Sequence, residues 1–313
     1  MPERLPDRRP PDHAAFAAEV AEAAAAGVEL DRLREQCTLT YDTEKHPFLE
    51  AVLSCLEMDL GCGQEGLAAL RETKPLTRRA GVARGASRGA STEFIQKFLA
   101  VKVKDPPAFA KFDAAYLDFI RNVVLPDIDD PKGVCFQRLP TFRCHVAHGG
   151  APTGHVHNDS QYGHSAREIN YWVPITTATA TNSLHCESAP GRGDFAPFEA
   201  GYGECVRFWG SQCVHYTQAN EEDITRVSFD FRVLPRSCYC EEAETRSQFV
   251  IGKFFAAMTA DGVVEARDDC GRRTSLRGEG DAGPNQGEDA GDEWADDYEL
   301  RTPWHDTVDS LHV

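Results

Sequence analysis

The stretch "RVSFDFRV", residues 226–233, alternates polar and apolar side chains along its whole length. Successive side chains of an extended strand leave opposite faces of a sheet, so this strand has one charged face and one apolar face. The two faces hold Arg226, Ser228, Asp230 and Arg232 on one side and Val227, Phe229, Phe231 and Val233 on the other. Either the charged face meets water, or the apolar face packs on other elements and the charged face lines the interior of a barrel.

Period-two patterns of this kind begin at about Val134 and continue to residue 233. Pro, Gly, Asn and Asp separate the runs, and no helical pattern lies between them. The runs are "VCFQRL" (134–139), "FRCHVA" (142–147), "EINYWVPIT" (168–176), "NSLHCES" (182–188), "CVRFWG" (205–210), "CVHYT" (213–217) and "ITRVSFDFRV" (224–233). Many short strands at close spacing predict an antiparallel sandwich or barrel, which we place at residues 131–258.

The N-terminal part of the chain, residues 1–130, has helical rather than strand periodicity. Asp12 can cap an Ala-rich helix that Gly27 would end, and apolar residues recur at helical spacing from Leu49 and over residues 107–124. We expect this helical region to support the sheet by packing against it. Within it, residues 74–89 are a basic loop, which either is solvated or covers an anionic ligand.

Composition restricts the partners and the compartment. The net charge of -17 argues against nucleic acid and anionic membranes as main partners, and no apolar run is long enough to span a membrane. Residues 259–313 are predicted to be an acidic, largely disordered tail, since residues 278–300 hold nine carboxylates and no Lys or Arg. The 11 cysteines include no CxxC, and no signal peptide is evident, so we expect reduced thiols and a cytoplasmic location.

Candidate metal ligands occur in "GHVHND", residues 154–159, where His155, His157 and Asp159 alternate. In an extended strand they would leave one face together. A further histidine, His215, lies in another strand-like run, and Arg226 follows it by eleven residues. If the polar face of residues 226–233 is buried, Arg226 needs an anion, and a guanidinium fork beside a Ser hydroxyl suits a carboxylate.

The pattern His157-x-Asp159, a distal His215 and Arg226-x-Ser228 resembles that of the 2-oxoglutarate/Fe(II)-dependent dioxygenases. The intervening "YGHSAREINYWVPIT", "NSLHCESAPGRGDFAP" and "RFWGSQCVHYTQANEEDITRVSFDFRV" are similar to the streptomycin-biosynthesis (StrG-like) branch of that superfamily. This resemblance covers about residues 140–235. It implies a double-stranded β-helix, the jelly-roll and cupin-like core, as the catalytic part of a mainly β protein with N-terminal helices.

The resemblance also implies a chemistry. His157, Asp159 and His215 would hold Fe(II) and form the catalytic centre, because two His and one carboxylate on one face of an octahedron leave three adjacent positions open. In the family, 2-oxoglutarate takes two of these positions and O2 takes the third. The far carboxylate of 2-oxoglutarate would bind Arg226 and Ser228, with Asn170 nearby. The expected reaction is hydroxylation, or another oxidation, of a C–H bond of a small polar metabolite.

Alternatives remain open at this point. His155, His157 and His215 could form a three-His set like that of cupin metalloproteins, although the Glu of that pattern is absent from residues 160–162. The protein could also be a cupin-like metalloenzyme without 2-oxoglutarate, or a non-catalytic jelly-roll binding module. A turn through "QANEED" (218–223) is expected to fold the strand of Arg226 back beside that of His215. Candidate substrate contacts are Arg143, His145, His155, Tyr162, Glu168, Trp172 and Glu187.

Overall fold

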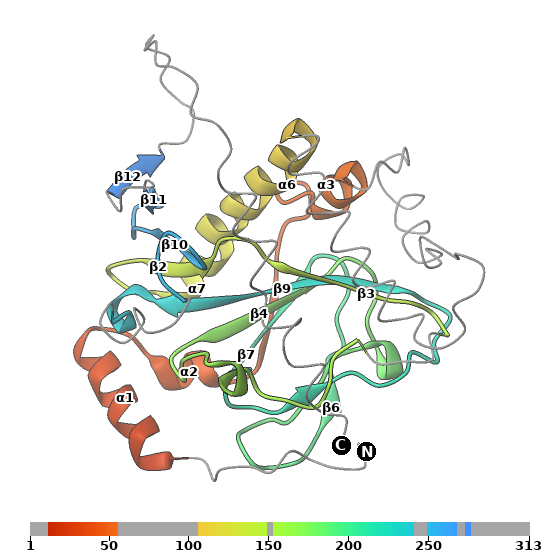
Figure 1. The fold of residues 1–313 in the computed structure, drawn as a ribbon, viewed down its shortest axis with the longest axis horizontal. Helices are drawn as coiled ribbons and strands as arrows, with labels where there is room; N and C mark the ends of the chain where they lie inside the picture. The colour runs from red at the N-terminus through yellow and green to blue at the C-terminus, as the bar shows by residue number, and fades with distance from the viewer. Residues whose placement is uncertain (1–11, 56–105, 149–152, 241–248, 268–272, 277–313) are drawn as a thin grey trace, which may run out of the picture. The chain divides into compact units, whose positions relative to one another are not determined.

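The centre of the fold is β9 (Arg226–Pro235), the strand with the alternating pattern (Figure 1). The computed structural model describes residues 12–55, 106–148, 153–240, 249–267 and 273–276. One edge of β9 pairs with β4 (Ile169–Pro174). The other edge pairs with β3 (Thr141–His145) and then with β2 (Val134–Gln137).

Two antiparallel sheets are built around this strand. The major sheet continues from β4 to β7 (Glu204–Phe208) and β1 (Cys37–Thr40), and from β2 to β10 (Phe255–Met258), β11 (Val264–Arg267) and β12 (Arg273–Leu276). The minor sheet consists of β6 (Ala196–Pro197), β5 (His185–Cys186) and β8 (His215–Tyr216). At the β8 edge of the minor sheet, His215 also forms an antiparallel bridge with His157.

The chain alternates between the two sheets. From β3 it passes to the His157 bridge, then to β4, to β5 and β6, to β7, to β8 and finally to β9, so major and minor sheets are visited in turn. This path gives the double-stranded β-helix that the sequence predicted. Each of the seven predicted runs contains a strand. Short 3-10 turns occur at Asp159–Tyr162, Ala180–Asn182 and Arg236–Cys238.

The expected pairing of the His215 strand with the Arg226 strand is wrong. β8 belongs to the minor sheet and β9 to the major sheet. The intervening residues 218–223 cross between sheets rather than forming a hairpin, and Asn220 fixes this crossing. Its side-chain amide donates to the carbonyl oxygens of His145 (3.0 Å) and Ile224 (2.9 Å), which ties the connection to the end of β3.

The boundaries of the sheet also differ from the expected ones. The helical region contributes β1, which covers the edge of β7 in the register Cys37↔Arg207 to Thr40↔Glu204. At the other end, β11 and β12 continue the sheet beyond residue 258, into the range expected to be tail. Both additions pair an edge that would otherwise expose unpaired backbone groups. The basic loop 74–89 and residues 277–313 lie outside the described residues.

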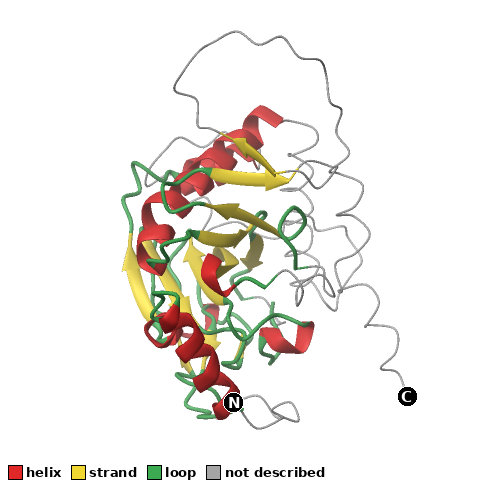
Figure 2. Cartoon of the chain, turned by 90° about the vertical axis from the view of Figure 1, so that its left-hand side faces the viewer, coloured by secondary structure: helices red, strands yellow, loops and turns green. Residues whose placement is uncertain are grey.

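The N-terminal helices lie outside the strands (Figure 2). They are α1 (His13–Ala25), α2 (Leu30–Arg34), α3 (Phe48–Cys55) and α6 (Pro106–Phe119), which continues through a π turn (Ile120–Val124) into α7 (Leu125–Ile128). The Phe229 ring of β9 lies 4.9 Å from Phe48 of α3 and 5.6 Å from Phe112 of α6. No described helix is long and apolar enough to cross a membrane.

Because helices cover the apolar face of β9, its polar face points between the sheets. Arg226 and Ser228 are buried there, as the barrel interpretation of the sequence required. The predicted packing of the helical region on the sheet is therefore confirmed for α3 and α6.

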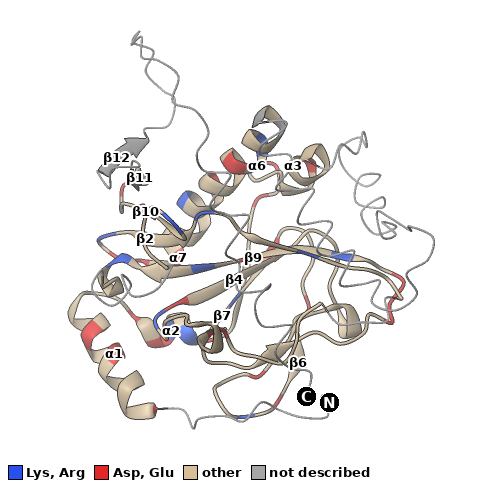
Figure 3. Cartoon of the chain, in the orientation of Figure 1, with Lys and Arg blue, Asp and Glu red and all other residues tan. Residues whose placement is uncertain are grey.

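Helix α1 begins and ends as the sequence predicts. The Asp12 carboxylate accepts a hydrogen bond from the Ala15 backbone N–H (3.0 Å), and Gly27 adopts φ +84° just beyond the helix, a conformation that glycine takes without a Cβ clash. Ion pairs then fix α1 to its surroundings. Glu19 pairs with Arg34 (2.5 Å) at the end of α2, and Glu22 pairs with Arg167 (2.8 Å) just before β4. Figure 3 shows acidic positions in red along α1.

Candidate functional site

His157, Asp159 and His215 come together between the two sheets, with one ligand atom of each within 4.8 Å of the others. The Asp159 Oδ1 atom lies 3.6 Å from His157 Nε2 and 3.7 Å from His215 Nε2. Reciprocal backbone hydrogen bonds between His157 and His215 (3.1 and 2.8 Å) bring the two imidazoles side by side. This is a set of two nitrogen donors and one oxygen donor arranged around a single point.

Both imidazoles have the tautomer that metal binding requires. His157 Nδ1 donates to the His155 carbonyl oxygen (2.6 Å), and His215 Nδ1 donates to the Cys213 carbonyl oxygen (3.0 Å). A carbonyl can only accept, so each proton sits on Nδ1 and leaves a lone pair on Nε2. Burial, together with the neighbouring His157, lowers the pKa of His215 to about 4, so this ring is neutral near pH 7.

The Asp159 carboxylate is held through one oxygen and leaves the other for a metal. Oδ2 accepts from Asn170 Nδ2 (2.7 Å) and from Arg232 Nε and Nη2 (3.1 and 3.0 Å). Oδ1 is buried and has no hydrogen bond within the described part of the chain. An orphaned carboxylate oxygen facing two Nε2 lone pairs fits a divalent cation.

The charge state of Asp159 also fits a metal ligand. Burial alone would raise the pKa of Asp159, but Arg232 and the two histidines outweigh burial and hold that pKa well below its ordinary value. Conversely, burial would lower the pKa of Arg232, and the charges of Asp159 and Asp230 instead raise it. The carboxylate is therefore ionised before any cation arrives.

The predicted single strand carrying His155, His157 and Asp159 is wrong. Only His157 makes a strand-like bridge, and Asp159 opens the 3-10 turn Asp159–Tyr162. The Asp159 backbone N–H donates to the Gly210 carbonyl oxygen (2.9 Å), which turns the carboxylate toward the two rings. The His155 side chain is exposed. The three-His alternative therefore lacks its third ring at the centre.

Asn170 was predicted to lie near the cosubstrate; in the structure it holds the Asp159 carboxylate, and its contact with a cosubstrate stays a prediction. Its amide nitrogen donates to Asp159, and the space it occupies depends on Gly210. A Cβ added at Gly210 would lie 2.7 Å from the Asn170 amide group and 2.7 Å from the Phe208 ring. Gly210 thus makes room for Asn170 and also provides the carbonyl that positions Asp159. No feature of the sequence pointed to Gly210.

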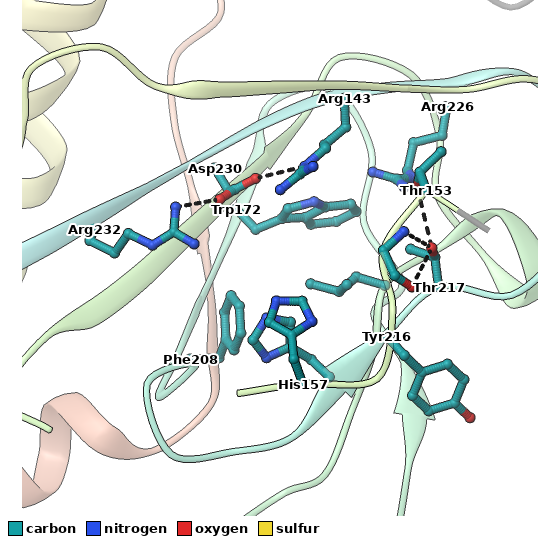
Figure 4. Close-up of a pocket in the computed structure, with 13 residues that line it drawn as sticks. Arg143, Thr153, His157, Trp172, Phe208, Tyr216, Thr217, Arg226, Asp230 and Arg232 are labelled. Atoms are coloured by element: carbon teal, nitrogen blue, oxygen red, sulfur yellow. Dashed lines mark hydrogen bonds and ion pairs between the residues drawn. The ribbon is translucent and has the colours of Figure 1, made fainter. Parts of the chain in front are cut away.

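Arg226 is a buried guanidinium beside this centre (Figure 4). Its Nε donates to the Asn182 carbonyl oxygen (2.6 Å), Nη1 to Ser228 Oγ (2.5 Å) and Nη2 to Thr153 Oγ1 (3.3 Å). The guanidinium carbon lies 5.6 Å from the Trp172 ring centre. Burial, reinforced by the positive charge of Arg143, lowers the pKa of Arg226 to about 10, yet the group remains charged near neutral pH.

Arg226 has unused capacity for an anion. No carboxylate of the described residues forms an ion pair with it, and its three printed contacts are to a carbonyl and two hydroxyls. Guanidinium has five N–H donors, so further donors are available for a carboxylate. A charge buried without a counter-ion is costly, and an anionic ligand would remove that cost.

The pocket that joins Arg226 to the metal ligands is lined from both sheets. Arg143 and Trp172, predicted from strand parity, both line it, and Arg232, Asp230, Thr153 and Thr217 were not predicted as site residues. Arg232 and Asp230 could have been found, since they share the polar face of Arg226. Thr217 could also have been found, since it shares the parity of His215 in the run 213–217, whereas Thr153 lies in an irregular segment, where parity gives no signal. The apolar part of the lining includes Leu184 and Phe208.

Three other predicted substrate residues serve the framework instead. Glu168 accepts hydrogen bonds from His164 Nδ1 (2.7 Å) and the Ser165 backbone N–H (2.8 Å) in the turn before β4. Glu187 accepts from the Val214 (2.8 Å) and Gly193 (3.0 Å) backbone N–H groups. These hydrogen bonds hold Glu168 in the turn before β4 and Glu187 beside the minor sheet. Neither side chain is among the residues that line the pocket.

His145 is the third of these residues. It is fully buried behind Arg226, and its Nδ1 lies 3.2 Å from the same Asn182 carbonyl oxygen that Arg226 contacts. Burial and the charge of Arg226 lower the pKa of His145 to about 3. Strand parity placed it between the sheets; it is not among the residues that line the pocket, and its contact with a substrate stays a prediction.

Two predicted residues lie at the edge of the centre. The Tyr162 ring is 41% exposed and its centroid is 5.3 Å from that of His157. His155 is exposed and contributes its carbonyl oxygen to His157. Contact of Tyr162 or His155 with a substrate stays a prediction.

Comparison with known proteins gives one local match in sequence. No protein-family model matches the chain. Over 111 residues, 36% of this chain and 52% of the relative, the chain is 41% identical to the streptomycin biosynthesis protein StrG of Streptomyces griseus. The matched part thus spans about half the length of that relative.

Solved structures with a similar arrangement are more distant. They include a non-heme monooxygenase, ThoJ, as its nickel complex (16% identity, 66% of this chain and 76% of that chain, TM-score 0.36). CytC3 with Fe(II) and alpha-ketoglutarate is 12% identical over 67% of this chain and 76% of that chain, with a TM-score of 0.37. A prolyl-4-hydroxylase of Pseudomonas putida is 14% identical over 71% of this chain and 99% of that chain, with a TM-score of 0.31. At these TM-scores the likenesses carry no conclusion about activity.

Proposed function

We propose that this protein is a non-haem Fe(II)/2-oxoglutarate-dependent oxygenase that oxidises a C–H bond of a small polar metabolite. The observation that carries the proposal is the pairing, in one pocket, of two features. One is a His157–Asp159–His215 set with three unused donor atoms. The other is a buried Arg226 without a carboxylate partner among the described residues.

The donor set supports iron in particular. Two neutral imidazoles and one carboxylate form the facial arrangement typical of non-haem Fe(II) oxygenases. The ligands are already in the protonation states that metal binding needs, because His215 is neutral and Asp159 is ionised near pH 7. When bound there, the ion would supply the activation of O2 and the oxidation of the substrate.

The second feature supports a dicarboxylate cosubstrate. A 2-oxo acid that reached the metal centre with one end could place its far carboxylate against Arg226. The Ser228 and Thr153 hydroxyls already orient the guanidinium from either side. Trp172 would flank the chain of the cosubstrate and keep water from it, since its ring lies beside Arg226 and is buried. Ordering of this kind holds the reacting groups close together and in the correct orientation.

The nature of the substrate is supported by two separate facts. Charged and hydroxyl groups dominate the polar part of the pocket lining, which suits a polar molecule better than a lipid. The partial match to a protein named for streptomycin biosynthesis is consistent with a small metabolite as substrate. We extend the proposal to a cytoplasmic location because the cysteine pattern suits a reducing compartment.

Arg226 provides the test. Anaerobic titration of the parent with Fe(II) and then 2-oxoglutarate should show saturable binding of both, followed by 2-oxoglutarate-dependent O2 consumption. Losing one partner of a desolvated charge pair costs roughly 2–5 kcal/mol, so Arg226→Ala should bind 2-oxoglutarate roughly 30-fold to several-thousand-fold more weakly. Its Fe(II) affinity should stay close to that of the parent. Arg226→Lys should recover only part of the loss, because an ammonium lacks the planar fork.

A matched control removes an arginine elsewhere. Arg192 is 66% exposed and lies 4.0 Å from Asp194, outside the pocket lining. Arg192→Ala should leave both affinities unchanged. Fe(II) binding without 2-oxoglutarate binding would point to a metalloenzyme of another kind. Binding of neither would favour a non-catalytic module. If Arg226→Ala bound 2-oxoglutarate as the parent does, the proposal would lose its main support.

A further inference from the structure

The pocket carries more positive charge than the proposed metal and cosubstrate would use. Of its described lining residues, three are arginines, Arg143, Arg226 and Arg232, and one, Asp230, is acidic. Adding the buried Asp159 carboxylate still leaves one net positive charge among these arginines and carboxylates. A divalent cation and a dicarboxylate cancel each other, so the excess would remain in the loaded pocket.

The three arginines are engaged to different degrees. Arg232 contacts both carboxylates, Asp159 at 3.0 Å and Asp230 at 3.1 Å. Arg226 is fully enclosed and, under the proposed function, binds the cosubstrate. Arg143 also lies near Asp230, with its Nε atom 3.7 Å from Oδ1.

Arg143 is also the most accessible of the three. Its side chain is 22% exposed, against 11% for Arg232, whereas Arg226 is enclosed. It lies on β3 directly opposite Ser228 of β9, so it enters the pocket from the neighbouring strand. Figure 4 shows the Arg143 side chain directed into the pocket above Trp172, on the side opposite His157.

We propose that Arg143 binds an anionic group, a carboxylate or a phosphate, of the primary substrate. This inference rests on the proposed function, since it takes Arg226 to be occupied by the cosubstrate. The Nη1 and Nη2 ends of a guanidinium whose Nε faces Asp230 form the fork that carboxylates and phosphates fit. The substrate anion would lie against β3 and direct the rest of the molecule toward the metal ligands.

The test uses small anions on the fully loaded protein. With Fe(II) and saturating 2-oxoglutarate present under anaerobic conditions, Arg226 is occupied, and acetate or methyl phosphate added as a probe reports any second anion site. Calorimetric titration of the parent should show binding of at least one probe in the millimolar range. Stronger binding of methyl phosphate would indicate a phosphorylated substrate, and equal or stronger binding of acetate would indicate a carboxylate.

The variants separate the substrate site from the cosubstrate site. Arg143→Gln should weaken probe binding roughly 10-fold to 100-fold, as expected for a lost charge-assisted contact, and should leave 2-oxoglutarate affinity nearly unchanged. Arg143→Lys should retain part of the probe binding, and Arg192→Gln, which removes the same charge at an exposed position, should retain all of it.

Three results would overturn the inference. The first is that the parent binds neither probe, and the second is that Arg143→Gln binds the probes as tightly as the parent does. The third is that Arg143→Gln weakens 2-oxoglutarate binding more than probe binding, which would make Arg143 part of the cosubstrate site. Failure of the proposed function is distinct from all three, because the parent would then not take up 2-oxoglutarate at the first step.

Discussion

At the residue scale, the site depends on how the oxygens of Asp159 are divided. Asn170 and Arg232 hold Oδ2, and Oδ1 is left free between His157 and His215. A carboxylate anchored through one oxygen has little rotational freedom left to lose, so the other oxygen is preorganised for a cation. The imidazoles are fixed in the same manner by backbone carbonyls.

Asp159 and His155 should differ sharply when each is replaced. Asp159→Ala should weaken Fe(II) binding by more than about 100-fold, since two neutral imidazoles bind the ion weakly and leave its charge uncompensated. His155→Ala should keep the metal, because that side chain is exposed and lies outside the His157–Asp159–His215 set, and the variant retains the backbone carbonyl that contacts His157. Anaerobic Fe(II) titration measures both. Asp159→Asn, which preserves side-chain shape beside Arg232, checks that any loss reflects the missing charge rather than misfolding. The reverse ranking would favour a three-His centre.

Asn170 and Gly210 should act on the metal without touching it. Asn170→Ala removes the 2.7 Å hydrogen bond to Asp159, and Gly210→Ala would push the Asn170 amide from its place. Loss of such a supporting contact typically costs roughly 10-fold to 100-fold in metal affinity. Both variants should show this loss in Fe(II) titration. Their midpoint of unfolding should change less than their Fe(II) affinity. Unchanged affinity in both would mean that Arg232 alone orients Asp159.

At the scale of elements, β9 serves two functions through its two faces. Its apolar face packs on α3 and α6, and its polar face supplies the pocket arginines. The helices thus stabilise the strand from outside without entering the site. Arg167 and Arg34 join α1 to the segment before β4, the strand that carries Asn170. Helical packing therefore determines where the supporting residues of the metal centre lie.

Phe229 should test the contribution of the apolar face. Its ring is fully buried between Phe48 and Phe112, and truncating a buried Phe to Ala typically costs about 3–5 kcal/mol. Phe229→Ala should lower the free energy of unfolding by that amount in urea denaturation. Phe195→Ala is the matched control, because Phe195 is only half-buried, beside Tyr216 of the minor sheet. It should cost clearly less. Equal losses would show that the helices do not stabilise β9 preferentially.

At the scale of the whole chain, contacts divide the protein into a unit of residues 1–276 and a second unit of residues 277–313. The site residues all belong to the first unit. The whole acidic run that begins after Gly278 falls in the second, so its charge is separated in sequence from the pocket. The strands β11 and β12 belong to the first unit, where they extend the major sheet.

Truncation after Leu276 should therefore leave the centre intact. A chain of residues 1–276 should bind Fe(II) with the affinity of the full chain and unfold at the same urea concentration, because no described contact of the site involves residues beyond Leu276. Truncation after Met258 is the contrasting variant. It removes β11 and β12, exposes the edge of β10 and should lower solubility or stability. A metal lost on truncation after Leu276 would show that the acidic segment supports the fold.

The sequence by itself determined the strands of the seven runs between residues 134 and 233 and the two faces of β9. Both follow from local regularities, since a period of two assigns faces along a strand whatever its neighbours are. The same rule placed Arg143 and Trp172 in the pocket. It did not bring Glu168 and Glu187 into the pocket lining, because backbone N–H groups bind both carboxylates: that of Ser165, close in sequence, binds Glu168, and that of Val214, far away in sequence, binds Glu187. The resemblance to a known family singled out His157, Asp159 and His215 as the candidate metal set, and the structure brings these three residues together.

Only the tertiary structure decided which strands face each other across the pocket. Asn220 turns the chain from the minor to the major sheet, so His215 and Arg226 face each other across the pocket instead of lying side by side. Only the structure, too, joined Arg232 and Asn170 to Asp159 and revealed the space that Gly210 leaves. These contacts link residues far apart in the chain, and their geometry depends on the packing of whole sheets. No local pattern encodes such distances, because the free energy that fixes them comes from burial shared across the entire fold.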